Sequence, residues 1–121
     1  MHQINEKPCF SVFGAYAWES LQMILIDPTP VLALTKRAGH KLSEYFQNVT
    51  AENKKDGSIV TQADRAAEKL LVQGLSSMYP DHTVISEEGT NHFAKGSTMT
   101  WYVDPLDGTS GFVEGLAHWG I

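Results

Sequence analysis

Two long stretches of the chain repeat apolar residues at helical spacing. In residues 31–46 the apolar side chains recur every three or four positions, with charged residues on the other faces. A second stripe of this kind runs through residues 61–78. Thr61 followed three residues later by Asp64 resembles a capping box, and Pro80 cannot continue a helix. Two amphipathic helices are therefore predicted.

Shorter segments between and after these helices have the composition of strands. Thr83–Ile85 and Met99–Val103 are rich in β-branched and aromatic residues and are bounded by turn-forming residues. Ser58–Val60 is a third candidate. Two helices followed by strands predict a layered α/β sandwich. Because no repeat or flexible linker interrupts it, residues 31–121 are expected to belong to one unit.

Residues 1–30 show no clear period. They mix aromatic residues without a repeat, and Asp27 to Pro30 then break the chain. Three interpretations stay open: an extra amphipathic helix, a subunit contact, or upstream sequence wrongly joined to the gene. This part is therefore an unassigned N-terminal extension.

Composition and charge narrow the function classes. The chain has 121 residues, enough for one hydrophobic core, and a net charge of -5. Its basic residues form no patch, which argues against nucleic acid as a partner. The apolar run at residues 21–26 is too short to cross a membrane, and Cys9 is the only cysteine. These features favour the cytoplasm.

The segment from Asp104 to Thr109 carries the clearest chemistry. Its sequence is Asp-Pro-Leu-Asp-Gly-Thr, and the proline must end the preceding strand. Asp104 and Asp107 can then converge across the bend, with the Leu106 carbonyl as a third oxygen ligand for a hard cation. Gly108 permits a tight turn, and a helix starting near Thr109 would offer free N–H groups to a phosphate. The alternative is a plain Asp-Gly turn with solvated carboxylates.

Acidic residues also lie at the end of a predicted strand and at the start of the second predicted helix. Glu87 and Glu88 follow an apolar strand, and strand alternation turns Glu87 towards a cleft and Glu88 the other way. Asp64 lies in the first turn of the second helix, where a capping role and a catalytic role are compatible.

Together these segments resemble the inositol monophosphatase superfamily. Asp104 to Thr109 matches its metal-binding signature, Glu87-Glu88 its acidic pair, and residues 56–64 the block before them. The resemblance runs from about Leu32 to the end of the chain. It implies an inositol monophosphatase-like sugar phosphatase fold, limited here to its N-terminal α+β half, and Mg²⁺ as cofactor.

The resemblance also implies roles for individual residues. Glu87, Asp104 and the Leu106 carbonyl would bind a first Mg²⁺, and Asp104 with Asp107 a second. Thr109 with Glu87 would orient the attacking water, and Asp64 would support the metal site. Either Lys54 or Lys55 would help to hold the loop before Asp64. The residues expected to bind the substrate phosphate are Asp107, Gly108, Thr109 and Ser110.

The reaction implied is Mg²⁺-dependent, Li⁺-sensitive hydrolysis of a small phosphate monoester such as inositol monophosphate. A 3'(2'),5'-bisphosphate nucleotidase and a histidinol-phosphate phosphatase are the enzymatic alternatives, and a non-catalytic remnant or interaction module is the alternative of another class. Members of the superfamily continue past this point, supply another aspartate ligand from their second half, and favour homodimers. We therefore expect the 121-residue chain to bind Mg²⁺ weakly and to hydrolyse little.

Overall fold

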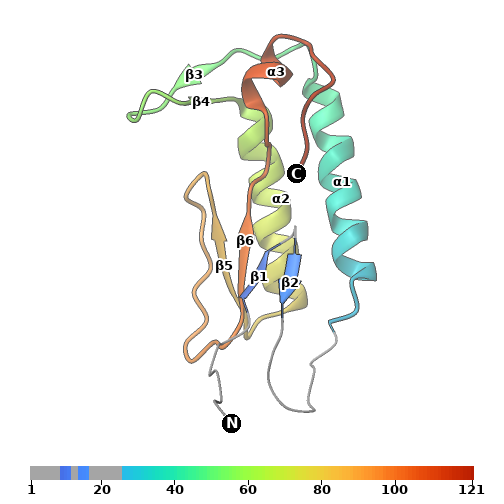
Figure 1. Ribbon diagram of the computed structural model, residues 1–121, viewed down its shortest axis with the longest axis vertical. Helices are drawn as coiled ribbons and strands as arrows, with labels where there is room; N and C mark the ends of the chain where they lie inside the picture. Colours follow the sequence, from blue (N-terminus) through green and yellow to red (C-terminus); the bar gives the residue numbers. More distant parts are fainter. Residues whose placement is uncertain (1–8, 12–13, 17–25) are drawn as a thin grey trace.

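The computed structural model describes residues 9–11, 14–16 and 26–121 (Figure 1). Both predicted helices are confirmed, as α1 (Thr29–Tyr45) and α2 (Gln62–Met78). Helix α1 begins before Val31, the first residue of the apolar stripe, because Pro30 is tolerated in a first turn. None of the helices in the described residues has the length and apolar character needed to cross a membrane.

The start of α2 confirms the predicted capping box. The Thr61 hydroxyl accepts hydrogen bonds from the backbone N–H groups of Ala63 and Asp64. In return, Asp64 Oδ2 accepts the backbone N–H of Thr61 at 2.8 Å. Such reciprocal bonds satisfy donors that have no partner within the helix. The cap therefore fixes where α2 begins, and with it the position of Asp64.

The main sheet has the strand order β2-β1-β6-β5. The two predicted strands are confirmed as β5 (Thr83–Ser86), at one edge of the sheet, and β6 (Thr100–Val103), and they pair in parallel. On the other side of β6 lie β1 (Cys9–Ser11), which is parallel to it, and β2 (Gly14–Tyr16), which is antiparallel to β1. A separate hairpin joins β3 (Glu52–Asn53) to β4 (Ile59–Val60). The predicted strand at Ser58–Val60 is thus confirmed in β4.

The N-terminal extension contributes strands where the structure describes it. Residues 9–11 and 14–16 form the β1–β2 pair, whereas an amphipathic helix was one of the interpretations of this extension. Residues 1–8, 12–13 and 17–25 lie outside the described part of the chain. The strand pairing places the extension next to β6, the strand that leads into the candidate metal loop.

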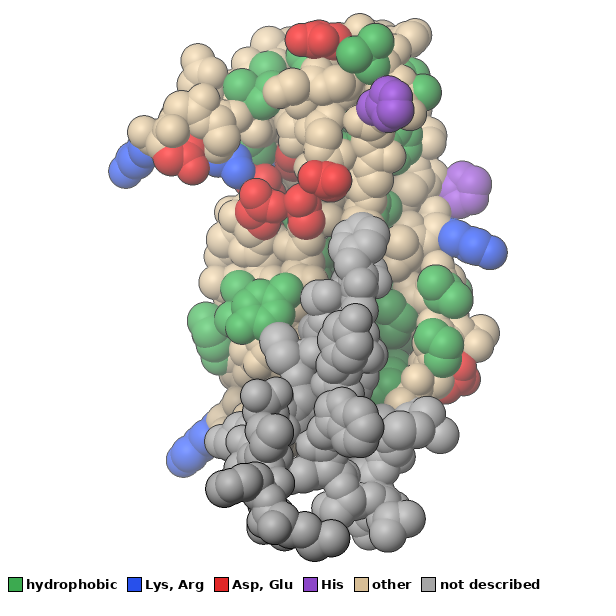
Figure 2. Space-filling view, viewed as in Figure 1, with side chains coloured by type: hydrophobic (Ala, Val, Ile, Leu, Met, Phe, Trp, Pro, Cys, Tyr) green, Lys and Arg blue, Asp and Glu red, His purple; other side chains and the backbone are tan. Residues whose placement is uncertain are grey.

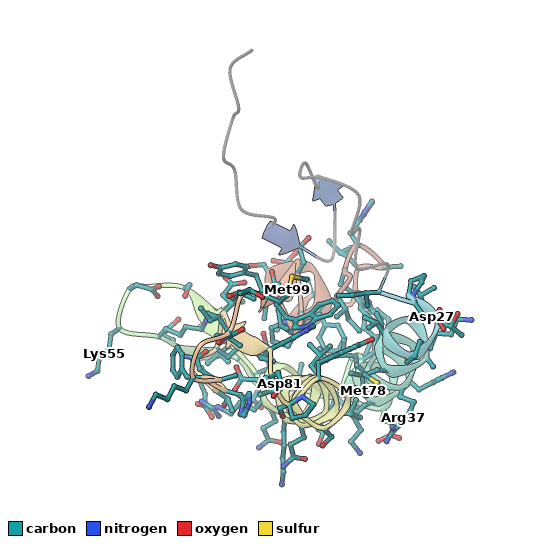
Figure 3. All side chains as sticks on the ribbon, turned by 90° about the horizontal axis from the view of Figure 1, so that it is seen from below. Asp27, Arg37, Lys55, Met78, Asp81 and Met99 are labelled. Carbon is teal, nitrogen blue, oxygen red and sulfur yellow. The ribbon has the colours of Figure 1, made fainter. Side chains whose placement is uncertain are left out.

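The helices and the sheet form layers. Helix α2 packs against β5 and β6, and α1 lies beside α2 (Figures 1 and 3). The helices approach closely at Gly74, where an added Cβ would lie 2.5 Å from Leu34 Cδ1. One cluster of buried residues fills the space between the helices and the sheet: Leu34, Ala38, Leu71, Val72, Leu75, Val84, Trp101 and Val103. A second lies near the start of α2 and supports the site: Leu42, Ala63, Ala67, Leu106 and Phe112.

Candidate metal centre

The loop after β6 turns sharply into the short helix α3 (Thr109–Val113). Asp104 stabilises the bend through Oδ1, which accepts the backbone N–H of Leu106 at 3.2 Å. Pro105 and Leu106 are buried, whereas Asp107 is exposed. The loop therefore packs its apolar residues into the core and leaves its carboxylates accessible from a cavity.

Gly108 is required by the geometry of this loop. It precedes α3 with a φ of 81°, in the left-handed region that favours glycine. An added Cβ would lie 2.6 Å from the carbonyl oxygen of His118. That segment is held against the loop by two backbone hydrogen bonds between Asp107 and Gly120, of 2.8 and 3.0 Å. Residues 118–120 thus fix the shape of the loop from Asp104 to Gly108, which we call the metal loop after its expected role.

A polar cavity of about 380 Å³ opens beside this loop. We use the name polar cavity for the space between the β3–β4 hairpin, the end of β5 and the loop after β6. Figure 2 shows acidic side chains gathered on this face, next to basic side chains of the hairpin. Seven of the eight residues expected at the site line the polar cavity: Glu87, Asp104, Leu106, Asp107, Gly108, Thr109 and Ser110. The eighth, Asp64, is buried behind the loop.

Asp104 and Glu87 form a close pair of carboxylates. Partial burial, together with a shared hydrogen bond and charge repulsion from Glu87, raises the pKa of Asp104 to about 6. Asp107 adds a smaller repulsion in the same direction. Two acids so close disfavour double ionisation unless a cation neutralises them. The structure therefore brings together the first two side chains expected to bind metal.

Asp64 and Thr109 are joined across 45 residues of sequence. Asp64 is fully buried and accepts the Thr61 backbone N–H, the Thr61 hydroxyl and, at 3.1 Å, the Thr109 hydroxyl. Thr109 Oγ1 is also 3.1 Å from the carbonyl oxygen of Leu106, and its one proton can go to only one acceptor at a time. The recorded hydrogen-bond partners of this hydroxyl are thus Asp64 and Leu106, and both Thr109 and Glu87 line the polar cavity in which they were expected to orient a water.

Glu88 departs from the expected direction. Strand alternation placed it opposite Glu87, but it lines the same polar cavity and forms a 2.6 Å ion pair with Lys54. The alternation fails because β5 ends at Ser86, before either glutamate. Between the two candidate lysines, Lys54 holds the hairpin over the cavity, whereas Lys55 lies at the outer tip of the loop (Figure 3).

Sequence reasoning missed one buried contact next to the site. Glu68 accepts a 2.7 Å hydrogen bond from the hydroxyl of Ser86, and both residues are buried. Ser86 directly precedes Glu87, so this contact holds the backbone from which that carboxylate projects. Glu68 lies one helical turn after Asp64, and this i, i+4 spacing of two acids on an otherwise apolar face is a signal that could have found it.

The donor set suits a hard divalent cation. Carboxylates and a backbone carbonyl are the ligand types that Mg²⁺ accepts, and Glu87, Asp104 and Leu106 supply them on one cavity wall. Within the described residues, no three His, Cys, Asp or Glu side chains converge closely enough to hold a metal by themselves. The residues thus fit Mg²⁺ as part of a coordination shell that other oxygen ligands would fill.

Comparison with known proteins agrees with this geometry. The family model described as the inositol monophosphatase family matches residues 27–121. The chain belongs to the inositol monophosphatase family. This match spans α1, α2, β5, β6 and the metal loop, and the strands β1 and β2 precede it.

Individual relatives match the same part of the chain. A histidinol-phosphatase of Chlorobaculum parvum is 37% identical over 92 residues, which are 74% of this chain and 35% of the relative. Nus factor SuhB of Salmonella typhimurium strain 14028s is 31% identical and covers 77% of the chain and 36% of the relative. The solved structure of an inositol monophosphatase from Thermotoga maritima superposes with a TM-score of 0.65 at 35% identity, over 74% of this chain and 35% of that one.

The coverage of the relatives shows how much of a family member this chain contains. It spans about a third of the length of these family members. The expected fold class is confirmed, as an N-terminal α+β part of the inositol monophosphatase fold. This part contains the metal loop and the acidic pair, and the remaining two thirds of a family-length chain are not represented in it.

Proposed function

We propose that this chain supplies the Mg²⁺-binding side of a phosphate monoesterase active site. The observation that carries the proposal is the close pairing of Asp104 with Glu87 in a cavity that also contains the loop of Gly108 and Thr109. A bound Mg²⁺ would neutralise the substrate phosphate and lower the pKa of a coordinated water. Glu87, Asp104 and the Leu106 carbonyl would hold one ion, and Asp104 with Asp107 a second.

The remaining residues would position the reactants. Thr109 can donate its proton to Asp64 and thereby keep its oxygen lone pairs for the hydrogen of a water. Asp64 can serve this role because its other hydrogen bonds fix it at the start of α2. The backbone N–H groups of Gly108 to Ser110 would bind the phosphate, and Lys54 would keep the hairpin over the cavity.

We infer a small phosphorylated metabolite as substrate, with inositol monophosphate as the first candidate. The names of relatives keep histidinol phosphate as an alternative, and a 3'(2'),5'-bisphosphate nucleotide is a third. We also infer inhibition by Li⁺. Because the chain covers only about a third of its relatives, little turnover is expected from the 121 residues alone.

A chimera tests the proposed function directly. The full chain would be joined covalently to the part of the Thermotoga maritima relative that follows its matched region. Phosphate release from the three candidate substrates would be measured with and without Mg²⁺. We expect Mg²⁺-dependent release that is lost in Asp104→Asn. A folded chimera that releases no phosphate, or one in which Asp104→Asn keeps full activity, would refute the proposal.

An interaction role is the second candidate. It is favoured by the lack of a three-ligand side-chain site in the described residues, and by relatives whose printed name is a factor rather than a phosphatase. On this reading the 121-residue chain would bind divalent cations no better than Asp104→Asn does. A titration with Mn²⁺, which accepts the same oxygen ligands, separates the two candidates.

A further inference from the structure

Helix α2 contacts the candidate metal centre through two buried carboxylates. Asp64 and Glu68 lie four residues apart, so their side chains project from the same face of the helix. Asp64 accepts a hydrogen bond from Thr109, at the start of the helix that follows the metal loop. Glu68 accepts a 2.7 Å hydrogen bond from Ser86, the last residue of β5. One face of α2 is thus tied to both segments that carry the expected metal ligands.

The Glu68 carboxylate is costly to keep in this position. Glu68 is 5% exposed, and apart from Asp64 the other buried residues of α2 are apolar. An acid in such surroundings destabilises the fold unless hydrogen bonds compensate for the lost water. Among the described residues, the recorded hydrogen bond to this carboxylate comes from Ser86. Packing alone would be served by an apolar pair at lower cost, so this contact has a role beyond filling the core.

Ser86 is held through each of its polar groups. Its hydroxyl donates to Glu68, and its backbone N–H donates to Asn91 Oδ1 at 2.9 Å. Its carbonyl oxygen accepts an N–H from the turn that follows. The next N–H along the chain, that of Glu87, donates to the carbonyl oxygen of Val103 on β6. The backbone from which Glu87 projects is therefore fixed on all sides.

The Glu87 side chain depends on this fixed backbone for its position. Glu87 is exposed, and its carboxylate shares a hydrogen bond with Asp104 in the polar cavity. A long exposed side chain loses rotamer entropy when it binds an ion, and a fixed backbone keeps that loss small. The separation of the two carboxylates therefore depends on where the end of β5 lies relative to the loop after β6.

We propose that Glu68 is a positioning residue for the metal ion. Through Ser86 it holds the Glu87 carboxylate beside Asp104, so that one divalent cation can bind both. Glu68 itself does not touch the ion. The inference rests on the proposed function, because it takes Glu87 and Asp104 as ligands of the cation.

Mn²⁺ titrations of the full 121-residue chain test the positioning role. Glu68→Ala should lower the affinity for Mn²⁺ about ten-fold, which is within the range for residues that orient metal ligands. Glu68→Gln should recover most of this loss, because its amide oxygen still accepts the Ser86 hydroxyl. Electron paramagnetic resonance of the free ion measures each affinity, and circular dichroism confirms that each variant is folded.

A double-mutant cycle tests whether Glu68 acts through Ser86. Ser86→Ala removes the donor and should lower the affinity as much as Glu68→Ala does. The double variant should then lose no more than either single variant. Ser76→Ala is the matched control, because the Ser76 hydroxyl also donates a hydrogen bond on α2, at 2.6 Å to the carbonyl oxygen of Val72. Ser76 does not line the polar cavity, so this variant should keep the wild-type affinity.

The outcomes separate the positioning role from the proposed function. Wild-type affinity in folded Glu68→Ala, or in folded Ser86→Ala, refutes the positioning role alone, provided that Asp104→Asn loses affinity. Equal losses in Glu68→Gln and Glu68→Ala also refute it, because the charge of Glu68 rather than its hydrogen bond would then act on the ion. Losses that add in the double variant refute it too, since the two residues would act independently. If Asp104→Asn keeps the wild-type affinity, the proposed metal site and the positioning role fail together.

Discussion

Two buried or partly buried aspartates of the site differ in what satisfies them. Asp64, at the start of α2, accepts hydrogen bonds from two Thr61 groups and from Thr109. Asp104, in the loop after β6, accepts one backbone N–H, and its partial burial together with the neighbouring Glu87 raises its pKa to about 6. The Asp64 carboxylate is therefore stabilised by hydrogen bonds from the protein itself. The charge of the Asp104 carboxylate is favourable only where a cation neutralises it, and this contrast supports our proposal that Asp104, unlike Asp64, binds a metal ion.

Removing the carboxylate of Asp64 should have the largest effect on stability. Asp64→Ala leaves the backbone N–H and the hydroxyl of Thr61 without their acceptor, removes one of the two acceptors of the Thr109 hydroxyl and breaks the capping box. We therefore expect a loss of about 3 kcal/mol in the free energy of unfolding. Denaturant unfolding measures it. Asp27→Ala is the control, because Asp27 also accepts an N–H beside a helix start but is exposed, and should cost less than about 1 kcal/mol. Equal losses would contradict the contrast between the two aspartates.

The matching change at Asp104 should act on metal binding instead. Asp104→Asn removes the repulsion with Glu87, so the metal-free protein should be as stable as the wild type or slightly more so. Its affinity for Mn²⁺, followed by electron paramagnetic resonance of the free ion, should fall more than about ten-fold, or about 1.4 kcal/mol. Asp81→Asn makes the same charge change at an exposed position away from the cavity and should leave the affinity unchanged. A destabilised Asp104→Asn with intact Mn²⁺ binding would reverse our assignment.

The raised pKa of Asp104 predicts that the stability of the metal-free protein and its affinity for Mn²⁺ change in opposite directions with pH. The pKa is about 6 in the folded protein against 3.8 ordinarily, so this group stabilises the metal-free fold below about pH 4. That contribution is lost as the pH rises through about 6. Mn²⁺ affinity should change the other way, rising roughly ten-fold between pH 5 and pH 7, because the proton competes with the cation. Titrations at several pH values test both signs, and a flat affinity profile would show that Asp104 does not bind the ion.

The smallest effect is expected at the hairpin that covers the cavity. Lys54 and Glu88 form a 2.6 Å pair that is largely shielded on the glutamate side, whereas Lys55 lies at the loop tip. A double-mutant cycle between Lys54→Met and Glu88→Gln should give a coupling of about 1 kcal/mol. The same cycle with Lys55→Met should give none. A coupling for Lys55 as large as that for Lys54 would mean that the hairpin is held differently.

The sequence predicts those parts of the site that depend on residues close together along the chain. The apolar period locates α1 and α2, Thr61 and Asp64 predict their own capping box, and Pro105 ends β6. These features depend on residues within a turn or two of each other, so spacing alone reveals them.

Contacts between distant residues were not predictable in the same way. The bond from Thr109 to Asp64 depends on how the loop after β6 packs against the start of α2, and no spacing encodes that packing. The contact between Glu68 and Ser86 likewise requires α2 to lie against β5. The strands β1 and β2 carry no alternating pattern that marks them, because their pairing depends on the neighbouring edge of β6.

The bond between Thr109 and Asp64 also has a consequence for the order of folding. It closes a loop of 45 residues, and Trp119 packs near Phe46 at a still greater sequence separation. Such closures cost chain entropy that is recovered only after α2 and the sheet have formed. The helices can therefore assemble early, whereas the metal loop acquires its shape in the last step. The helical scaffold can thus be in place before residues 118–120 close against the loop after β6 and give it its final shape.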